Sequence, residues 1–150
     1  MAMVVADIGA LNILKAYFNN TRPSNSLGLA SANDLQLRLF ATNVTPNANG
    51  TDTAATFTQA AGGGYAAKTL TNGSWTCAAS NPADATYAIQ TWTFSGVLTT
   101  NATIYGYYIV DSDGVLVTAE ALTAFTPTSS GTDTFSVTPK IQASYGTPAA

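Results

Sequence analysis

The pattern of a β-hairpin at residues 103–117 constrains the fold of this chain more than any other stretch. Residues 103–110 (TIYGYYIV) carry bulky side chains on both faces, and Gly106 in their middle indicates a bulge or a close backbone approach. Residues 111–114 (DSDG) combine turn-starting residues with a glycine that supplies positive φ. Residues 115–117 (VLV) then return as the partner strand. The sequence therefore predicts a β-hairpin here.

Two further runs have strong strand patterns. Residues 35–40 alternate, with Leu35, Leu37 and Leu39 facing a core, which predicts a half-buried strand. Residues 87–94 (YAIQTWTF) are rich in aromatic, β-branched and threonine residues on both faces, which predicts a strand covered at least partly on each side.

Weaker strand patterns lie at residues 53–59, 65–70, 74–78 and 134–143. Asn72-Gly73 predicts a hairpin turn between the second and third of these runs. Pro139 predicts that the last run is an edge strand or is broken there. Residues 21–34, 43–52 and 79–85 are predicted loops, because turn-forming residues dominate them.

One helix is predicted near the start of the chain. Asp7 is suited to cap it, and an apolar stripe at near-helical spacing predicts a helix over residues 8–18. The alternative is an apolar arm that lies on a neighbour. The fold class is all-β: one domain, residues 1–150, built as a β-sandwich or jelly-roll-like fold or a small barrel, with one short N-terminal helix or arm. Its parts are an arm or helix (1–20), a β core (35–143) and a loose tail (144–150).

Composition excludes several classes of function. The chain is 46% hydrophobic but only 9% charged, against about 25% charged in an average soluble domain. Its five Lys and Arg residues are scattered and the net charge is −3, so no nucleic-acid partner is expected. No apolar run reaches the ~18 residues of a membrane span, and the first residues are a poor signal peptide, so no membrane partner is expected.

Residues for common catalytic and metal sites are scarce. The chain has no His and one Cys, which excludes an intrachain disulfide and, within one chain, Ser-His or Cys-His catalysis and zinc sites. Cys77 is predicted to be a buried structural thiol. We expect no enzyme activity, no catalytic residue, no metal ligand and no cofactor.

Three motifs have a functional and a simpler structural interpretation. Residues 111–114 resemble the start of a calcium loop, but the later ligands and the closing Glu are absent, which favours a turn. Residues 62–64 (GGG) lack the Lys-Ser/Thr of a phosphate loop, which favours a flexible turn. A glycosidase site needs two carboxylates that face each other. Sequence spacing does not place together any two of the four candidates: Asp84, Asp111, Asp113 and Glu120.

The aromatic residues permit a second class of function. Exposed Tyr and Trp rings suit the faces of sugars, so a carbohydrate-binding platform is one hypothesis. Burial in a core or in a subunit interface is the more common role of such rings.

Four segments in order resemble a family of small structural proteins of tailed bacteriophages: LQLRLFATNVTP (35–46), GYAAKTLTNGSWT (64–76), ATYAIQTWTFSG (85–96) and TIYGYYIVDSDGVLVTAEAL (103–122). The resemblance extends over most of the chain, including the apolar start. Residues 118–120 (TAE) depart from the family, where an aromatic residue is expected in the returning strand.

The resemblance implies a head decoration, or cement, protein on the outer surface of the capsid. The implied partners are the major capsid protein and further copies of this chain, as a homotrimer. The apolar start predicts interface residues at Val4, Val5, Ile8 and Leu11. The alternative is a tail- or fibre-associated adhesin that binds host glycans.

Overall fold

The computed structural model describes residues 13–15, 17–18, 34–47, 51–80, 82–129 and 131–143. The regular secondary structure of these residues is mostly antiparallel β-sheet, which confirms the all-β fold class. The chain divides into two compact units. Unit 1 comprises residues 1–33, 71–89 and 138–150, and unit 2 comprises residues 34–70 and 90–137. That all 150 residues form one domain stays a prediction.

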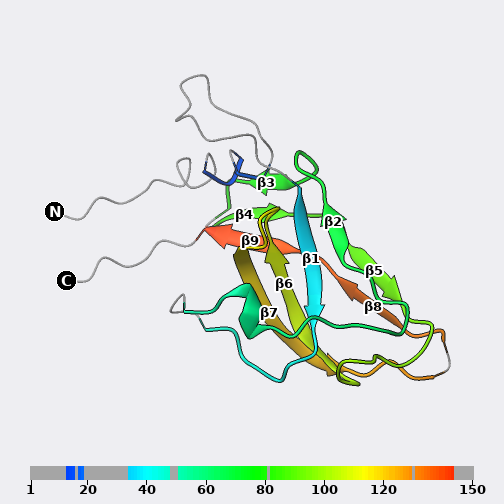
Figure 1. Ribbon diagram of the computed structural model, residues 1–150. Helices are drawn as coiled ribbons and strands as arrows, with labels where there is room; N and C mark the ends of the chain where they lie inside the picture. The colour runs from blue at the N-terminus through cyan, green and yellow to red at the C-terminus, as the bar shows by residue number, and fades with distance from the viewer. Residues whose placement is uncertain are drawn as a thin grey trace. The chain divides into compact units, whose positions relative to one another are not determined.

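Unit 2 contains a four-stranded antiparallel sheet (Figure 1). Its strands, in spatial order, are β2 (Lys68–Leu70), β1 (Leu35–Phe40), β6 (Ile104–Val110) and β7 (Leu116–Phe125). β1 alternates as predicted: Leu35, Leu37 and Leu39 are buried, whereas Gln36 is exposed. Period-two alternation therefore identified this strand correctly.

The predicted hairpin is formed by β6 and β7. Gly114 has φ +81°, and the Asp111 carboxylate accepts hydrogen bonds from the backbone N–H groups of Asp113 (3.0 Å) and Val115 (2.8 Å). A Cβ added to Gly106 would lie 2.1 Å from the Glu120 carbonyl oxygen, and a bulge lies beside this glycine. Close backbone approach therefore explains the glycine. The return strand is longer than predicted, because it continues to Phe125.

A second sheet in unit 2 pairs β5 (Gln90–Thr93) with β8 (Thr134–Val137). The Phe125 ring of β7 lies 5.1 Å from the Phe135 ring and 5.9 Å from the Phe94 ring, centroid to centroid. Aromatic contacts thus link the two sheets, and the arrangement is sandwich-like.

The prediction of a strand at 87–94 with cover on both faces is wrong in its extent and burial. Only residues 90–93 are a strand; Trp92 is buried, while Thr91 and Thr93 are exposed. Ile89 is 63% exposed. Threonine fits the solvent face of a pleated strand as well as a covered one, so composition alone did not separate the two cases.

The strand predicted at 53–59 is also wrong. The 3-10 helix η1 (Ala54–Thr56) occupies this place, and its start is fixed by the Thr53 N–H, which donates to the Thr56 hydroxyl at 3.1 Å. The adjoining Phe57 ring packs with Phe40 and Tyr108 in a buried cluster. Burial of one aromatic side chain therefore determines the path of this loop.

The glycine triplet forms a turn with positive φ at all three positions. Its backbone meets residues 95–99: the Ser95 N–H donates to the Gly63 carbonyl at 2.9 Å, and a Cβ on Gly63 would lie 2.4 Å from the Gly96 oxygen. The triplet is needed for both backbone conformation and close approach.

Unit 1 contains a three-stranded sheet in the order β3 (Thr76–Ala78), β4 (Ala83–Thr86) and β9 (Lys140–Ala143). The prediction of a loop over residues 79–85 is wrong at its end, because β4 begins at Ala83. Asn72-Gly73 does form a turn, with Gly73 at φ +87°, but the strands on its two sides do not pair with each other. The predicted hairpin is therefore wrong. The predicted break at Pro139 is correct, because it separates β8 from β9.

Residues 13–15 and 17–18 are helical, in agreement with the predicted helix at those positions. Leu14 and Phe18 are buried, and the Phe18 ring centroid lies 4.7 Å from that of Trp75. The Gly73 N–H also donates to the Phe18 carbonyl at 3.1 Å. The remainder of the predicted helix and the predicted loose tail at 144–150 lie outside the described residues.

Candidate functional site

The open edge of the four-stranded sheet is the strongest candidate binding surface of unit 2. β7 is the last strand in the sheet order, and β6 is its only strand neighbour among the described residues. None of its ten residues is buried, and Glu120 is its only charged residue. A strand paired on one side leaves alternate backbone N–H and C=O groups directed outward, which is a template for another strand.

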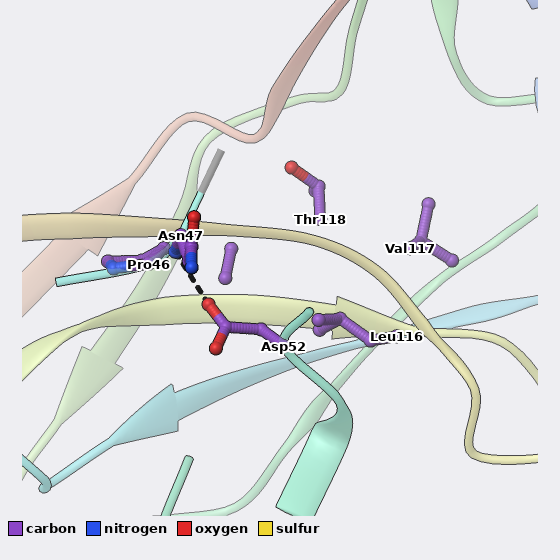
Figure 2. A pocket seen from close by; sticks show the side chains of 7 residues that line it. Pro46, Asn47, Asp52, Leu116, Val117 and Thr118 are labelled. Carbon is purple, nitrogen blue, oxygen red and sulfur yellow. Dashed lines mark hydrogen bonds between the residues drawn. The ribbon is translucent and has the colours of Figure 1, made fainter. Parts of the chain in front are cut away.

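A groove runs beside the first half of this strand (Figure 2). It has a volume of about 430 Å³ and lies between Pro46, Asn47 and Asp52 on one side and residues 116–119 of β7 on the other. In Figure 2 the Asp52 carboxylate lies next to Asn47, whose backbone N–H donates to it at 2.6 Å. The groove therefore has an acidic wall held in place by the loop backbone.

A second hollow, of about 460 Å³, continues toward the hairpin turn. Asp52 and Leu116 line both hollows, so the two are adjacent along the strand. Val115 lines the second hollow and is 61% exposed. An exposed apolar side chain at the mouth of a groove provides a contact that another protein segment would bury.

Four carboxylates lie on or beside this edge: Asp52, Asp111, Asp113 and Glu120. Asp111 fixes the turn, and Glu120 accepts a 2.6 Å hydrogen bond from the buried Tyr107 hydroxyl. Within the described part of the chain, no salt bridge joins any of the four to a Lys or Arg. Unit 2 as a whole contains six acidic and two basic side chains, a formal charge of −4. The edge is therefore a locally acidic surface.

The other candidate acid of the sequence belongs to unit 1. The Asp84 carboxylate pairs with the Lys140 ammonium at 3.0 Å, and hydrogen bonding to Lys140 lowers the Asp84 pKa. Asp84 thus belongs to a different unit from the other three candidates, Asp111, Asp113 and Glu120. Asp111 and Asp113 occupy one turn, where Asp111 serves as a backbone acceptor. Among the described residues, no group of three or more His, Cys, Asp or Glu side chains could hold a metal ion.

Both tryptophans are in the interior. Trp75 is 2% and Trp92 is 3% exposed, and the Trp92 indole N–H donates to the Ala66 carbonyl at 2.7 Å. The most exposed aromatic ring among the described large hydrophobic residues is Tyr17, at 40%. A sugar platform built on indole rings is therefore not present on the described surface.

Cys77 is only half-buried, whereas a buried structural thiol was predicted. It lies on β3, where both neighbours in the strand are exposed, so only one face of this short strand is covered. Partial burial raises the pKa of the Cys77 thiol, which disfavours the reactive thiolate.

The predicted interface residues Val4, Val5, Ile8 and Leu11 lie outside the described residues. The open edge, in contrast, was not among the predicted sites. Its signal is present in the sequence as LVTAEALTAF (116–125), a long β-type run with one charge and no proline. Such a run lacks the usual features that protect an edge, but its edge position becomes evident only from the strand order.

No helix among the described residues is both long and apolar enough to cross a membrane. Comparison of the chain with models of protein families, with curated proteins and with solved structures found no match.

Proposed function

We propose that this protein is a head decoration protein of a tailed bacteriophage, which binds the outer surface of the capsid and stabilises contacts of the major capsid protein. The observation that carries the proposal is the open β7 edge: ten strand residues, none buried and one charged, beside a groove. A surface of this kind serves adhesion between proteins rather than chemistry on a substrate.

The composition supports the same role. Interface cores are depleted in charge and enriched in aromatic residues, and this chain is 9% charged and 10% aromatic. Binding to the assembled shell, and not to its dissociated subunits, would stabilise the shell by mass action. Neither a cofactor nor a catalytic group is needed for this function.

The proposed assembly is a homotrimer at a local three-fold position of the capsid. Closed rotational symmetry repeats one interface in each subunit. The apolar residues Val4, Val5, Ile8 and Leu11 are proposed as contacts to a neighbouring subunit, because burial of aliphatic side chains is favourable.

A tail-associated adhesin is the alternative function. The burial of Trp75 and Trp92 counts against it, because stacking on sugars requires exposed rings. We therefore place the decoration role first.

Immunogold labelling of purified virions with an antibody to this chain, viewed by negative-stain electron microscopy, tests the location. Gold distributed over the heads is the expected result. Gold confined to the tails would favour the adhesin, and unlabelled virions would contradict a virion role altogether.

The stabilising role has its own test. Heads that lack the protein should burst at lower temperature and under milder osmotic shock than complete heads. Equal resistance of the two preparations would contradict cementing even if the label lies on heads.

A further inference from the structure

We propose that the β7 edge binds an extended, positively charged segment of a partner protein, which pairs with β7 as a fifth strand and directs lysine or arginine side chains toward the acidic residues beside it. The inference deepens the proposed function, and it rests on that proposal for the identity of the partner as a capsid protein.

The backbone of β7 determines the conformation of the partner. Its outward N–H and C=O groups lie in a row at strand spacing, and an extended chain satisfies them in register. β7 is long enough to accept a run of strand residues rather than one bridge, since it spans Leu116–Phe125. A helical segment presents no free row of backbone groups and would leave this edge unpaired.

The groove provides specificity along the first half of the edge. Val115 and Leu116 offer apolar surface there, while Asp52 contributes a carboxylate to the wall. Residues of a paired strand alternate between the two faces of a sheet. In the matching segment, apolar or threonine residues therefore face the groove. They alternate with residues whose side chains lie on the other face of the sheet.

Charge selects a basic partner over a second copy of this chain. Antiparallel pairing of two β7 strands would bring two acidic edges together, each with Glu120 in the strand and Asp113 in the adjoining turn. Like charges across strands destabilise pairing, whereas opposite charges stabilise it and accelerate association. Antiparallel self-pairing of one strand also yields a two-fold contact, which does not close a trimer.

The direct test uses the whole chain and a labelled synthetic peptide. The probe is about ten residues long, to match β7, and alternates lysine with valine or threonine. Fluorescence anisotropy at low salt should show saturable binding. A peptide with glutamate in place of lysine should bind at least about tenfold more weakly, and raised salt should weaken binding of the lysine peptide.

Two further reagents separate strand pairing from general attraction between charges. N-methylation of alternate peptide nitrogens keeps the charge but blocks the edge hydrogen bonds, so binding should again fall at least about tenfold. In the protein, Thr123→Lys adds a charge to the exposed edge of β7 and should reduce binding by a similar factor. Thr69→Lys makes the same change at the exposed position of β2, at the opposite edge of the sheet, and should alter binding less than about twofold.

Each contrary result overturns the inference in a distinct way. Absence of peptide binding, or equal binding of the glutamate peptide, would exclude a basic partner. Equal binding of the N-methylated peptide would exclude strand pairing. A dimer in light scattering that Thr123→Lys dissociates, with both variants otherwise folded by circular dichroism, would assign the edge to a second copy.

These outcomes are independent of the virion test. Gold on tails together with peptide binding at β7 would contradict capsid decoration and leave the edge inference intact. Gold on heads without peptide binding would contradict the edge inference and leave the decoration proposal intact.

Discussion

The two edges of the four-stranded sheet differ in the features that control strand pairing. β2 is three residues long, Leu70 in it is buried, and Lys68 is its first residue. β7 is ten residues long, has no buried residue and contains one acid. Short strands and lysine are the common means by which natural proteins block an edge. The comparison indicates that one edge of this sheet carries the features that block strand pairing, whereas the other lacks them.

Lys68 contributes to this difference in a second way. Its ammonium nitrogen lies 5.8 Å from the centroid of the Trp92 ring, within the range of a cation–π interaction. The contact thus gives the Lys68 side chain a defined position on the edge strand. β7 has no basic residue to serve this purpose.

Among the substitutions that test the difference between the β2 and β7 edges, Gly106→Ala is expected to have the largest effect. The added Cβ would lie 2.1 Å from the Glu120 carbonyl oxygen and 2.5 Å from the Phe40 ring, so β7 must separate from β6. We expect a loss of about 3 kcal/mol in the free energy of unfolding, measured with denaturant. Hydrogen exchange should accelerate in β7 more than in β2.

Gly96→Ala is the matched control for this substitution. No atom lies within 4 Å of a Cβ built there, and the change should alter stability by less than about 0.5 kcal/mol. Equal losses in the two variants would show that close approach at β6 and β7 is not the reason for the effect.

A smaller effect is expected from Tyr107→Phe, which removes the 2.6 Å hydrogen bond to the Glu120 carboxylate. Because Glu120 is exposed and regains water, the loss should be about 1 kcal/mol. Thermal unfolding measures it. Tyr105→Phe on the same strand is the control, and a loss as large there would mean that removal of any phenol hydroxyl from β6, rather than of this bond, causes the effect.

Lys68→Ala tests the blocked edge. Loss of the cation–π contact should reduce stability by about 0.5 to 1 kcal/mol. Without the lysine, β2 should also self-associate more at high concentration, as measured by light scattering. If Lys68→Met, which keeps the apolar stem, behaves like the natural protein in both assays, charge does not distinguish the two edges.

The smallest expected effect is on the pH dependence of stability, and it serves as a reference for the carboxylates beside β7. Thr128 donates from its hydroxyl and its backbone N–H to the Asp133 carboxylate, and these bonds lower the Asp133 pKa below the ordinary value of an aspartate. A lowered folded-state pKa contributes stability above the unfolded-state pKa, and this contribution is lost as pH falls through the folded-state pKa. Thermal scans should therefore show Tm falling below about pH 4.

Asp133→Asn should flatten part of that fall in Tm. An unchanged pH profile in this variant would assign the acid sensitivity to other carboxylates, including those beside β7.

Much of the fold was predictable because local rules and tertiary packing agree. β1 alternates with period two, the DSDG turn specifies the β6–β7 hairpin, and Pro139 interrupts the last run. Elements were missed where tertiary contacts prevail. Ala-rich β4 has weak strand propensity but lies between β3 and β9, and burial of Phe57 favours η1 over the predicted strand.

The candidate site was less predictable than the fold. Residues 116–125 contain a visible charge-poor run, but their position at an edge depends on which strands pair, and periodicity does not encode strand order. The Asn72-Gly73 turn illustrates the same limit. The turn forms, yet the strands that flank it join different sheets.

The interleaving of the two units along the chain has a consequence during synthesis. All segments of unit 2 have been translated by residue 137, whereas the sheet of unit 1 needs β9, which comes afterwards. Residues 87–139 separate β4 from β9, and ribosomes add about 5–20 residues per second, so β4 waits roughly 3 to 10 seconds for its second neighbour. On the ribosome, unit 2 is thus able to fold first, and closure of the unit 1 sheet is a late step that a nascent chain must reach without mispairing β4.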